Sequence, residues 1–224
     1  DEFGISTNWS GYQSAATDVS GVEGAWRVVP ITGTTRDASY AVWIGLGGIR
    51  EADVLQIGSH AIKTTSSVRY TLWYELYPAA PKIIPISVRV GDTVYAKISR
   101  RERGFWLLEL HNKTTKKHFR VVVSYPHVFT TAAWILERPH RLNKSFVPFA
   151  QIPTVSMTMV GVWNDGKRTN LFESSAQPIT MVDVDAKYVQ AYVAATDEQG
   201  NGFSIKRGSQ SMPWIVPTGY TIHE

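Results

Sequence analysis

The sequence predicts an all-β fold in which two packed antiparallel sheets form a β-sandwich. Three observations support this prediction. Runs of strand-forming residues recur along the chain, while the periodicity of amphipathic helices is nearly absent. Turn residues (glycine, proline, asparagine and aspartate) separate the runs. Short, closely spaced strands bury their apolar faces by closing into a sandwich or barrel, and 224 residues suffice for one such domain over 1–224.

The clearest expected strand spans 68–77, where two differently lined faces alternate. Successive side chains of a strand point to opposite faces, so Glu75 is expected to share a face with Trp73 and Tyr77. The Pro-rich segment 78–85 is expected to be a loop rather than a domain boundary. The other expected strands are 40–46, 93–99, 105–110, 119–123, 132–136, 155–162, 179–184 and 188–194.

The composition is that of a soluble globular chain, with 43% hydrophobic, 12% aromatic and 19% charged residues. The absence of cysteine excludes disulfide scaffolds, thiolate zinc sites and cysteine nucleophiles. The 23 Lys and Arg residues exceed the 19 Asp and Glu residues by four, an excess too small to indicate a partner. Prolines and polar residues interrupt the longest uncharged stretch, 145–164, so no membrane-spanning helix is expected.

Several well-known catalytic motifs are missing from the sequence. There is no zinc-binding HExxH pair, no serine-hydrolase nucleophile elbow, no phosphate-binding Walker loop and no dinucleotide fingerprint. In the glycine-rich segment 45–48, Arg50 stands where the fingerprint needs its third glycine, so we expect a tight loop after a strand. The six histidines show no i, i+4 pairing, and no metal site is expected.

Basic residues gather between 100 and 120. Nucleic acid could bind such a cluster through its phosphates, with Trp106 as a stacking platform. We favour a solvated hairpin whose lysines protect an edge strand, and we expect no nucleic-acid partner. Asn8, Asn112 and Asn143 stand in N-x-Ser/Thr sequons, which favours an extracytoplasmic chain.

A set of short blocks resembles a known family. They are Asn-Trp-Ser-Gly at 8–11, Trp-Ile-Gly at 43–45, Leu-Gln-Ile-Gly at 55–58, Leu-Trp-Tyr-Glu-Leu-Tyr-Pro at 72–78, Ala-Trp-Ile-Leu-Glu at 133–137 and Val-Pro-Phe-Ala at 147–150. In these blocks and their order, the chain resembles the eqolisins, the glutamic peptidases. The last third of the chain is similar only in its strand-like character.

The resemblance implies a lectin-like (concanavalin-type) β-sandwich that is an acid-active endopeptidase, with Gln56 and Glu137 as its catalytic pair. A carboxylate can take a proton from the attacking water and later deliver it to the leaving amine. An amide N–H can stabilise the oxyanion of the tetrahedral intermediate, and the amide carbonyl can help to hold the water. By the same resemblance, the residues that bind the substrate are Trp9, Trp43, Glu75 and Tyr77.

The resemblance also implies polypeptide substrates, no metal or organic cofactor, no membrane or nucleic-acid partner, and a monomer. It further implies secretion after removal of a signal peptide or propeptide, with which a chain beginning at Asp1 agrees.

The sequence departs from the family pattern at three positions. Gly47, His60 and Thr71 stand where aspartates are expected from the resemblance. Fewer carboxylates near Glu137 mean less like-charge repulsion, so that contribution raises the pKa of Glu137 less. We therefore expect an activity optimum less extreme than that of the acidic relatives.

Two alternatives stay open at this stage. The segment 51–56 (Glu-Ala-Asp-Val-Leu-Gln) differs at one residue from the E-x-D-x-x-E signature of lectin-like glycosidases, but the amide of Gln56 cannot protonate a leaving oxygen. A carbohydrate-binding sandwich without catalysis could instead use the eight tryptophans as stacking platforms. That reading predicts exposed aromatic side chains in a groove and no dependence on Glu137.

Overall fold

The computed structural model describes residues 4–209, 212 and 213. The described residues form sixteen β-strands joined by turns and loops, with no helix among them. The all-β prediction is therefore confirmed. In this part of the chain, no helix is long and apolar enough to cross a membrane.

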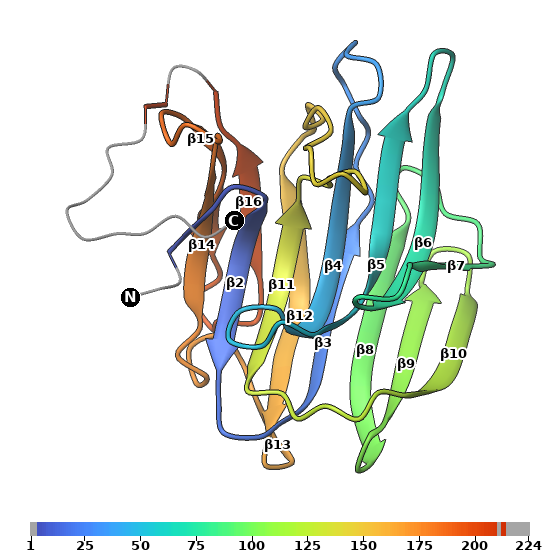
Figure 1. Ribbon diagram of the computed structural model, residues 1–224, viewed down its shortest axis with the longest axis vertical. Coiled ribbons are helices and arrows are strands. Elements are labelled where there is room, and N and C mark those ends of the chain that lie inside the picture. The colour runs from blue at the N-terminus through green and yellow to red at the C-terminus, as the bar shows by residue number, and fades with distance from the viewer. Residues whose placement is uncertain (1–3, 210–211, 214–224) are drawn as a thin grey trace.

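The strands pair in one continuous order that doubles back on itself (Figure 1). We call its two parts the front half and the rear half. The front half consists of β14 (Gln177–Val182), β2 (Trp9–Ala15), β11 (Thr131–Glu137), β4 (Ser39–Gly47), β5 (Val54–Lys63), β6 (Val68–Leu76) and β7 (Lys82–Ile84). The rear half consists of β15 (Val189–Thr196), β16 (Phe203–Arg207), β12 (Val155–Asn164), β3 (Val19–Arg27), β8 (Thr93–Glu102), β9 (Phe105–Asn112) and β10 (Lys117–Ser124).

Two short strands lie off this path. β1 (Ile5–Ser6) pairs in parallel with β14, and β13 (Lys167–Thr169) pairs with β12. All pairs along the path itself are antiparallel.

Strand β14 connects the two halves because it changes partner along its length. Its residues 177–179 pair with β2, whereas Met181 and Val182 pair with β15. The expectation of two separate sheets is therefore not confirmed, since the hydrogen bonding continues from one half into the other.

The two halves face each other across an apolar core. Trp134 of β11 donates a hydrogen bond from its indole nitrogen to the main-chain oxygen of Glu23 in β3, at 2.8 Å. Trp26 of β3 donates to Oγ of Ser59 in β5, at 2.9 Å. Both indoles are fully buried, so each tryptophan fills core volume and also satisfies its one polar group.

Strand β4 is buried on both of its faces. Tyr40, Val42 and Ile44 lie in the main core, whereas the alternate residues Ala41 and Trp43 belong to a second apolar cluster on the opposite face. We call it the outer cluster, and its members are Ala41, Trp43, Trp73, Ala133, Ile135 and Ile179. An antiparallel sheet commonly leaves one face in water. The buried apolar residues on the outer face of the front half therefore distinguish this region from an ordinary solvated surface.

The basic segment and one sequon take part in ordinary structural contacts. Arg100 pairs with Asp18 at 2.7 Å, and β10 stands at the end of the strand order, as expected for an edge strand. Asn112 is fully buried and donates to Oδ2 of Asp92 at 2.8 Å. Its sequon therefore cannot carry a glycan in the folded protein.

Candidate active site

The candidate site is built on the outer face of the front half, around Trp43 of β4. A Cβ at Gly58 would lie 2.5 Å from Cβ of Trp43, and a Cβ at Gly45 would lie 2.8 Å from Cζ3 of its indole. Both distances are shorter than side chains tolerate. Trp43 therefore occupies space that only glycines on the same face leave open, and its indole is fully buried.

Glu137, the last residue of β11, is held by two indoles. The Nε1 atom of Trp43 donates to Oε2 of Glu137 at 2.6 Å. Trp9 is the register partner of Glu137 on β2, and its ring meets that of Trp43 edge-on, with centroids 4.9 Å apart. Burial raises the pKa of Glu137 to about 7, the hydrogen bonds from Trp43 and Trp9 oppose this rise, and the charge of Glu75 adds to it.

Gln56 of β5 forms the second polar pair of the site with Glu75 of β6. The two are register partners, and Nε2 of Gln56 donates to Oε2 of Glu75 at 2.5 Å. An ionised carboxylate only accepts hydrogen bonds, so Glu75 orients the amide nitrogen toward itself. The Oε1 atom of Gln56 is buried and has no hydrogen-bond partner among the described residues. Burial raises the pKa of Glu75, and the bond from Gln56 partly offsets this.

The register places Gln56 and Glu137 on the same face, on either side of β4. Glu137 of β11 is the register partner of Ala41 in β4, and Gln56 of β5 is the register partner of Gly45 in β4. Trp43 lies between Ala41 and Gly45, on the same face of β4. The structure thus brings the expected residues together as two hydrogen-bonded pairs, Trp43–Glu137 and Gln56–Glu75. The pairs are linked electrostatically, because the charge of Glu75 raises the pKa of Glu137.

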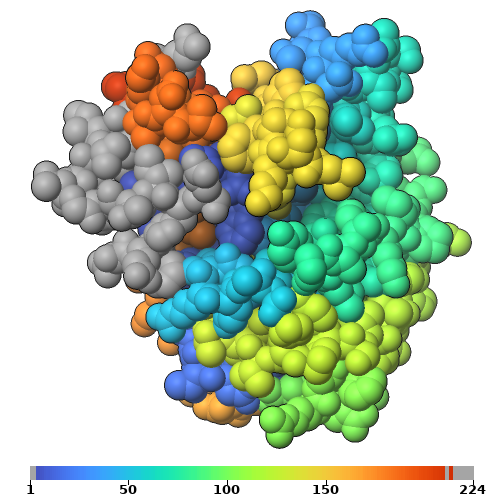
Figure 2. Space-filling view, in the orientation of Figure 1, coloured from blue at the N-terminus to red at the C-terminus, as the bar shows by residue number. Residues whose placement is uncertain are grey.

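A cleft of about 830 Å³ opens beside these pairs. Figure 2 shows the hollow on the front face, between the segment near 140–146, the segment near 48–52 and the end of β6. Of the expected residues, Trp9 and Tyr77 line the cleft, whereas the polar pairs are not among its lining residues. The contact between the rings of Trp9 and Trp43 connects the cleft to Glu137.

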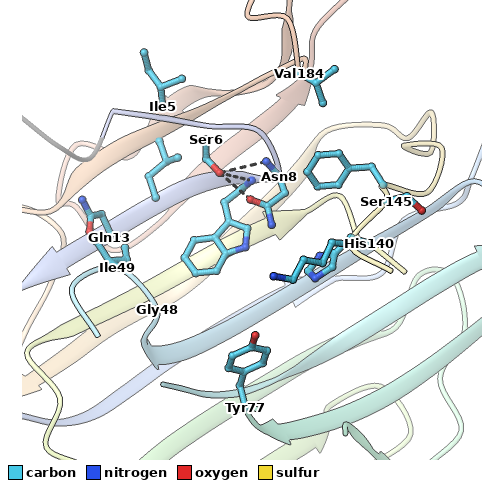
Figure 3. A pocket seen from close by; sticks show the side chains of 14 residues that line it. Ile5, Ser6, Asn8, Gln13, Gly48, Ile49, Tyr77, His140, Ser145 and Val184 are labelled. Atoms are coloured by element: carbon cyan, nitrogen blue, oxygen red, sulfur yellow. Dashed lines mark hydrogen bonds between the residues drawn. The ribbon is translucent and has the colours of Figure 1, made fainter. Parts of the chain in front are cut away.

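The cleft also has lining residues that the sequence did not assign to a substrate-binding site. They are Ile5, Ser6, Asn8, Gln13, Gly48, Ile49, His140, Lys144, Ser145, Phe146, Ile179 and Val184 (Figure 3). A signal for Gln13 was present, since it follows Trp9 by four residues and a strand over 9–15 would have placed both on one face. The sequence pattern alone predicts no strand there. The segment 140–146 carries no strand pattern, and nothing in its sequence indicates that it borders a cleft.

The three departures from the family pattern leave the site with few carboxylates. At Gly47, φ is 80° and a Cβ would lie 2.1 Å from the main-chain oxygen of Asp53, so the backbone itself requires glycine. His60 shares a hydrogen bond of 3.0 Å with Ser39, and burial lowers its pKa. Thr71 is the register partner of His60.

In the described part of the chain, no group of three or more histidine, aspartate or glutamate side chains could hold a metal ion.

The alternatives lose support in the structure. Oε1 of Glu51 accepts from Oγ1 of Thr130 at 2.6 Å and its Oε2 accepts from Thr131 at 2.8 Å, while Asp53 lies 2.9 Å from His127. Both acids of the glycosidase-like segment therefore anchor the loop that borders the cleft. The stacking-platform reading requires exposed indoles, yet the fully buried tryptophans include Trp26, Trp43, Trp106 and Trp134.

Comparisons with known proteins identify the family. A model of the peptidase A4 family matches residues 7–207. Scytalido-glutamic peptidase, in a crystal structure with a transition-state-analogue inhibitor, is similar with a TM-score of 0.78 and 23% identity, over 90% of this chain and 98% of that one. SCP-B, a member of the eqolisin family in complex with the tripeptide Ala-Ile-His, has a TM-score of 0.74 and 22% identity, over 90% of this chain and 98% of that one.

Aspergilloglutamic peptidase from Aspergillus niger is similar with a TM-score of 0.66 and 19% identity, over 76% of this chain and 99% of that one. A comparison with curated proteins found no match. These structural likenesses agree with the all-β fold, and the family model spans most of the chain. The chain therefore belongs to the peptidase A4 family, the eqolisins, and is a glutamic peptidase.

Proposed function

We propose that the protein is an endopeptidase that hydrolyses polypeptides with Gln56 and Glu137 as its catalytic dyad. One observation carries this proposal: Glu137 is a carboxyl group of pKa about 7, held at 2.6 Å by Trp43 beside a large cleft. A general base works best when its pKa lies near the pH of the reaction, and burial supplies that match here.

In the proposed mechanism, Glu137 enters the reaction as a carboxylate and accepts a proton from a water molecule. The water oxygen bonds to the carbonyl carbon of the scissile peptide, and the carbonyl π pair moves onto its oxygen. Glu137 then returns the proton to the amide nitrogen as the C–N bond breaks. General base and acid roles of this kind typically contribute about 10²–10⁴-fold to the rate.

Gln56 is proposed to stabilise the oxyanion. Its Nε2 atom carries two hydrogens, one of which is engaged by Glu75 at 2.5 Å, so the other remains for the substrate oxygen. Glu75 then acts as a positioning residue that holds the amide before the reaction begins, and such preorganisation is what makes an oxyanion site effective. Trp9 and Tyr77 are proposed to contact the peptide, since both line the cleft.

The decisive experiment compares the wild type with Glu137→Gln and Gln56→Ala on a denatured protein substrate at several pH values. Loss of an oxyanion donor costs about 10²–10³-fold in kcat, which is the effect expected of Gln56→Ala, and Glu137→Gln should lose at least as much. Matched controls are Glu102→Gln and Gln177→Ala, because both side chains are exposed and outside the cleft lining. A wild type that leaves the substrate intact at every pH, or a Glu137→Gln variant as fast as the wild type, would refute the dyad.

We further propose that the front and rear halves form a lectin-like β-sandwich, that residues 1–224 are one domain, and that the protein is a secreted monomer. The core between the halves supports the sandwich, and the sequons at Asn8 and Asn143 favour secretion. Light scattering coupled to size-exclusion chromatography tests the monomer directly. A dimer at micromolar concentration would contradict it.

A further inference from the structure

Gln13 stands out in the cleft because its amide is buried but incompletely paired. It is 2% exposed, lines the cleft, and lies on β2 on the same face as Trp9. Its Oε1 atom has no hydrogen-bond partner among the described residues. A buried carbonyl oxygen left without a donor costs about 1–3 kcal/mol, so an apolar side chain would serve folding better here.

The surroundings of Gln13 are apolar. Figure 3 shows Gln13 beside Ile49 and Gly48, at the opposite end of the cleft from His140 and Ser145. Its register partners are Ala133, a small member of the outer cluster, and Gln177 of β14.

Gln177 does not pair with Gln13. Its side chain is exposed, and its Nε2 atom donates instead to the main-chain oxygen of Ser175 at 3.3 Å. The amide of Gln13 is therefore not paired with the amide of Gln177 on the neighbouring strand.

Among the described residues that line the cleft there is no aspartate or glutamate, and Lys144 is the one lysine or arginine. A substrate lysine or arginine at the Gln13 end would thus enter an apolar site without a carboxylate partner, which is costly. A substrate carboxylate at this end would place an oxygen that only accepts hydrogen bonds against Oε1 of Gln13, which is also an acceptor. A neutral carboxamide matches both atoms, because its N–H donates to Oε1 and its oxygen accepts from Nε2.

We propose that Gln13 forms a subsite that selects glutamine or asparagine side chains of the polypeptide substrate. The proposal rests on the proposed peptidase function and adds a preference at one position of the bound polypeptide. Discrimination arises because a substrate without an amide leaves the buried Oε1 atom of Gln13 unpaired, and sites of this type reject such analogues strongly.

The test is cleavage-site profiling of denatured protein substrates by mass spectrometry. The wild type should show glutamine and asparagine enriched at one position flanking the cut. Two peptides that differ only by Gln or Leu at that position should then differ in kcat/KM by about 10- to 100-fold in favour of Gln.

Variants of Gln13 assign the preference to its amide. Gln13→Leu should remove the enrichment and reverse the Gln-to-Leu ratio, and the near-isosteric Gln13→Met should do the same if the leucine variant folds poorly. Gln177→Leu makes the same change on the neighbouring strand, outside the cleft lining, and should keep the wild-type ratio.

The outcomes separate the two proposals. Cleavage without amide enrichment, or enrichment that survives both Gln13 variants, overturns the subsite and leaves the peptidase intact. Absence of all cleavage overturns the proposed function. In that case, fluorescence anisotropy with the Gln and Leu peptides decides on the subsite, since equal affinities would overturn it and tighter binding of the Gln peptide would support it.

Discussion

The pKa of Glu137 is controlled by a few neighbouring residues. Burial and the charge of Glu75 raise it, whereas the indole hydrogen bonds of Trp43 and Trp9 lower it, and the result is about 7. A carboxyl group of pKa about 7 is half ionised at that pH and mostly ionised above it, so the less extreme optimum expected from the sequence stays a prediction for a profile of kcat/KM against pH. Burial is the largest cause of the shift, and repulsion by Glu75 is a smaller cause in the same direction.

The first prediction concerns the indole donor. Trp43→Phe keeps a ring in the cluster but removes the N–H that stabilises the carboxylate, so the pKa of Glu137 should rise. A hydrogen bond to a charged group contributes about 1.5–3 kcal/mol, so a rise of about one to two pH units is expected. The acidic limb of the kcat/KM profile against pH should move up by that amount. An unmoved limb would show that the indole does not tune this carboxylate.

The second prediction concerns stability and pH. The pKa of Glu137 is about 7 in the folded chain against an ordinary value of 4.5, so the folded state binds this proton more tightly. The resulting stabilisation is complete below pH 4.5 and is lost as the pH rises through 7. Glutamine does not titrate and keeps an acceptor for Trp43. Glu137→Gln should therefore exceed the wild type in free energy of unfolding by about 2–3 kcal/mol at pH 8, and match it near about pH 4.

Urea unfolding at the two pH values measures this difference. Glu102→Gln, at an exposed position of β8, should show no such pH-dependent gain. Equal stability of Glu137→Gln and the wild type at pH 8 would argue against a carboxylate destabilised by burial.

At the scale of elements, glycines explain why several strands were not expected from sequence. The missed strands include β2, β3 and β5, and these contain Gly11, Gly21, Gly24 and Gly58. Glycine within a strand resembles a turn signal, but here it permits close packing. At Gly24, a Cβ would lie 3.1 Å from Cγ2 of Ile44 on the facing half, a contact that local sequence cannot reveal.

The third prediction tests this role at the site. Gly58→Ala places a Cβ 2.2 Å from the main-chain oxygen of Val42 and 2.5 Å from Cβ of Trp43, so β4 and β5 must move apart. We expect a loss of about 3 kcal/mol in the free energy of unfolding, together with lower activity as Trp43 shifts. Urea unfolding and peptide cleavage measure the two effects.

Gly33→Ala is the matched control, because its Cβ would meet only the side chain of Gln151, at 3.2 Å. It should cost much less than Gly58→Ala. Similar losses for the two variants would mean that close packing at Gly58 is not the cause.

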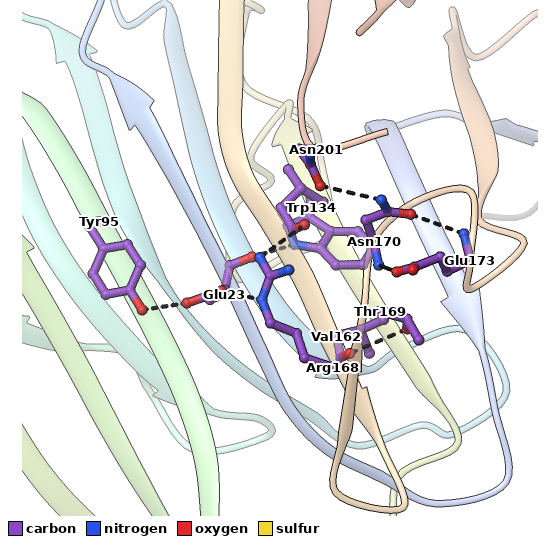
Figure 4. Close-up of polar contacts among 10 residues, drawn as sticks. Glu23, Tyr95, Trp134, Val162, Arg168, Thr169, Asn170, Glu173 and Asn201 are labelled. Atoms are coloured by element: carbon purple, nitrogen blue, oxygen red, sulfur yellow. Dashed lines mark hydrogen bonds and ion pairs between the residues drawn. The ribbon is translucent and has the colours of Figure 1, made fainter. Parts of the chain in front are cut away.

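At the scale of the whole molecule, a set of hydrogen bonds around Glu23 ties the front half to the rear half (Figure 4). Glu23 of β3 accepts Trp134 at its main-chain oxygen, and its carboxylate accepts Tyr95 at 2.5 Å and Arg168 at 2.7 Å. Trp134 lies on β11, the strand that ends in Glu137. The rear half therefore supports the strand that carries the proposed base.

The fourth prediction follows from this link and from the continuous strand order. Trp134→Phe removes a fully buried indole and leaves the oxygen of Glu23 without its donor, which should cost about 3 kcal/mol. A loss of this size lowers Tm by roughly 6–12 °C in a chain of this length. Because the halves share one core, near-UV circular dichroism and activity should be lost together.

Trp163→Phe is the control for that variant. Trp163 is partly exposed and packs beneath Nζ of Lys97, 4.5 Å from its ring centroid, so it should change Tm little. Two separate transitions in the wild type would instead indicate that the halves unfold independently.

The sequence by itself determined the all-β class, the family, and the residue types available for chemistry. Those properties follow from local alternation, turn residues and short ordered blocks. Each of these can be recognised in the sequence without knowing which strands pair. It also indicated that Glu75 and Trp73 lie on the same face of their strand. Side chains alternate between the two faces of a strand whichever strands pair with it.

Only the tertiary structure decided which residues meet. The partner change in β14, the two hydrogen-bonded pairs around Trp43 and the buried amide of Gln13 all depend on strands that are distant in sequence. Strand order and register are set by non-local packing of glycines, indoles and strand edges, and no local pattern encodes them. For the same reason, the sequence indicated only a weaker like-charge contribution to the pKa of Glu137, whereas the principal cause of its shift, burial, appeared only in the fold.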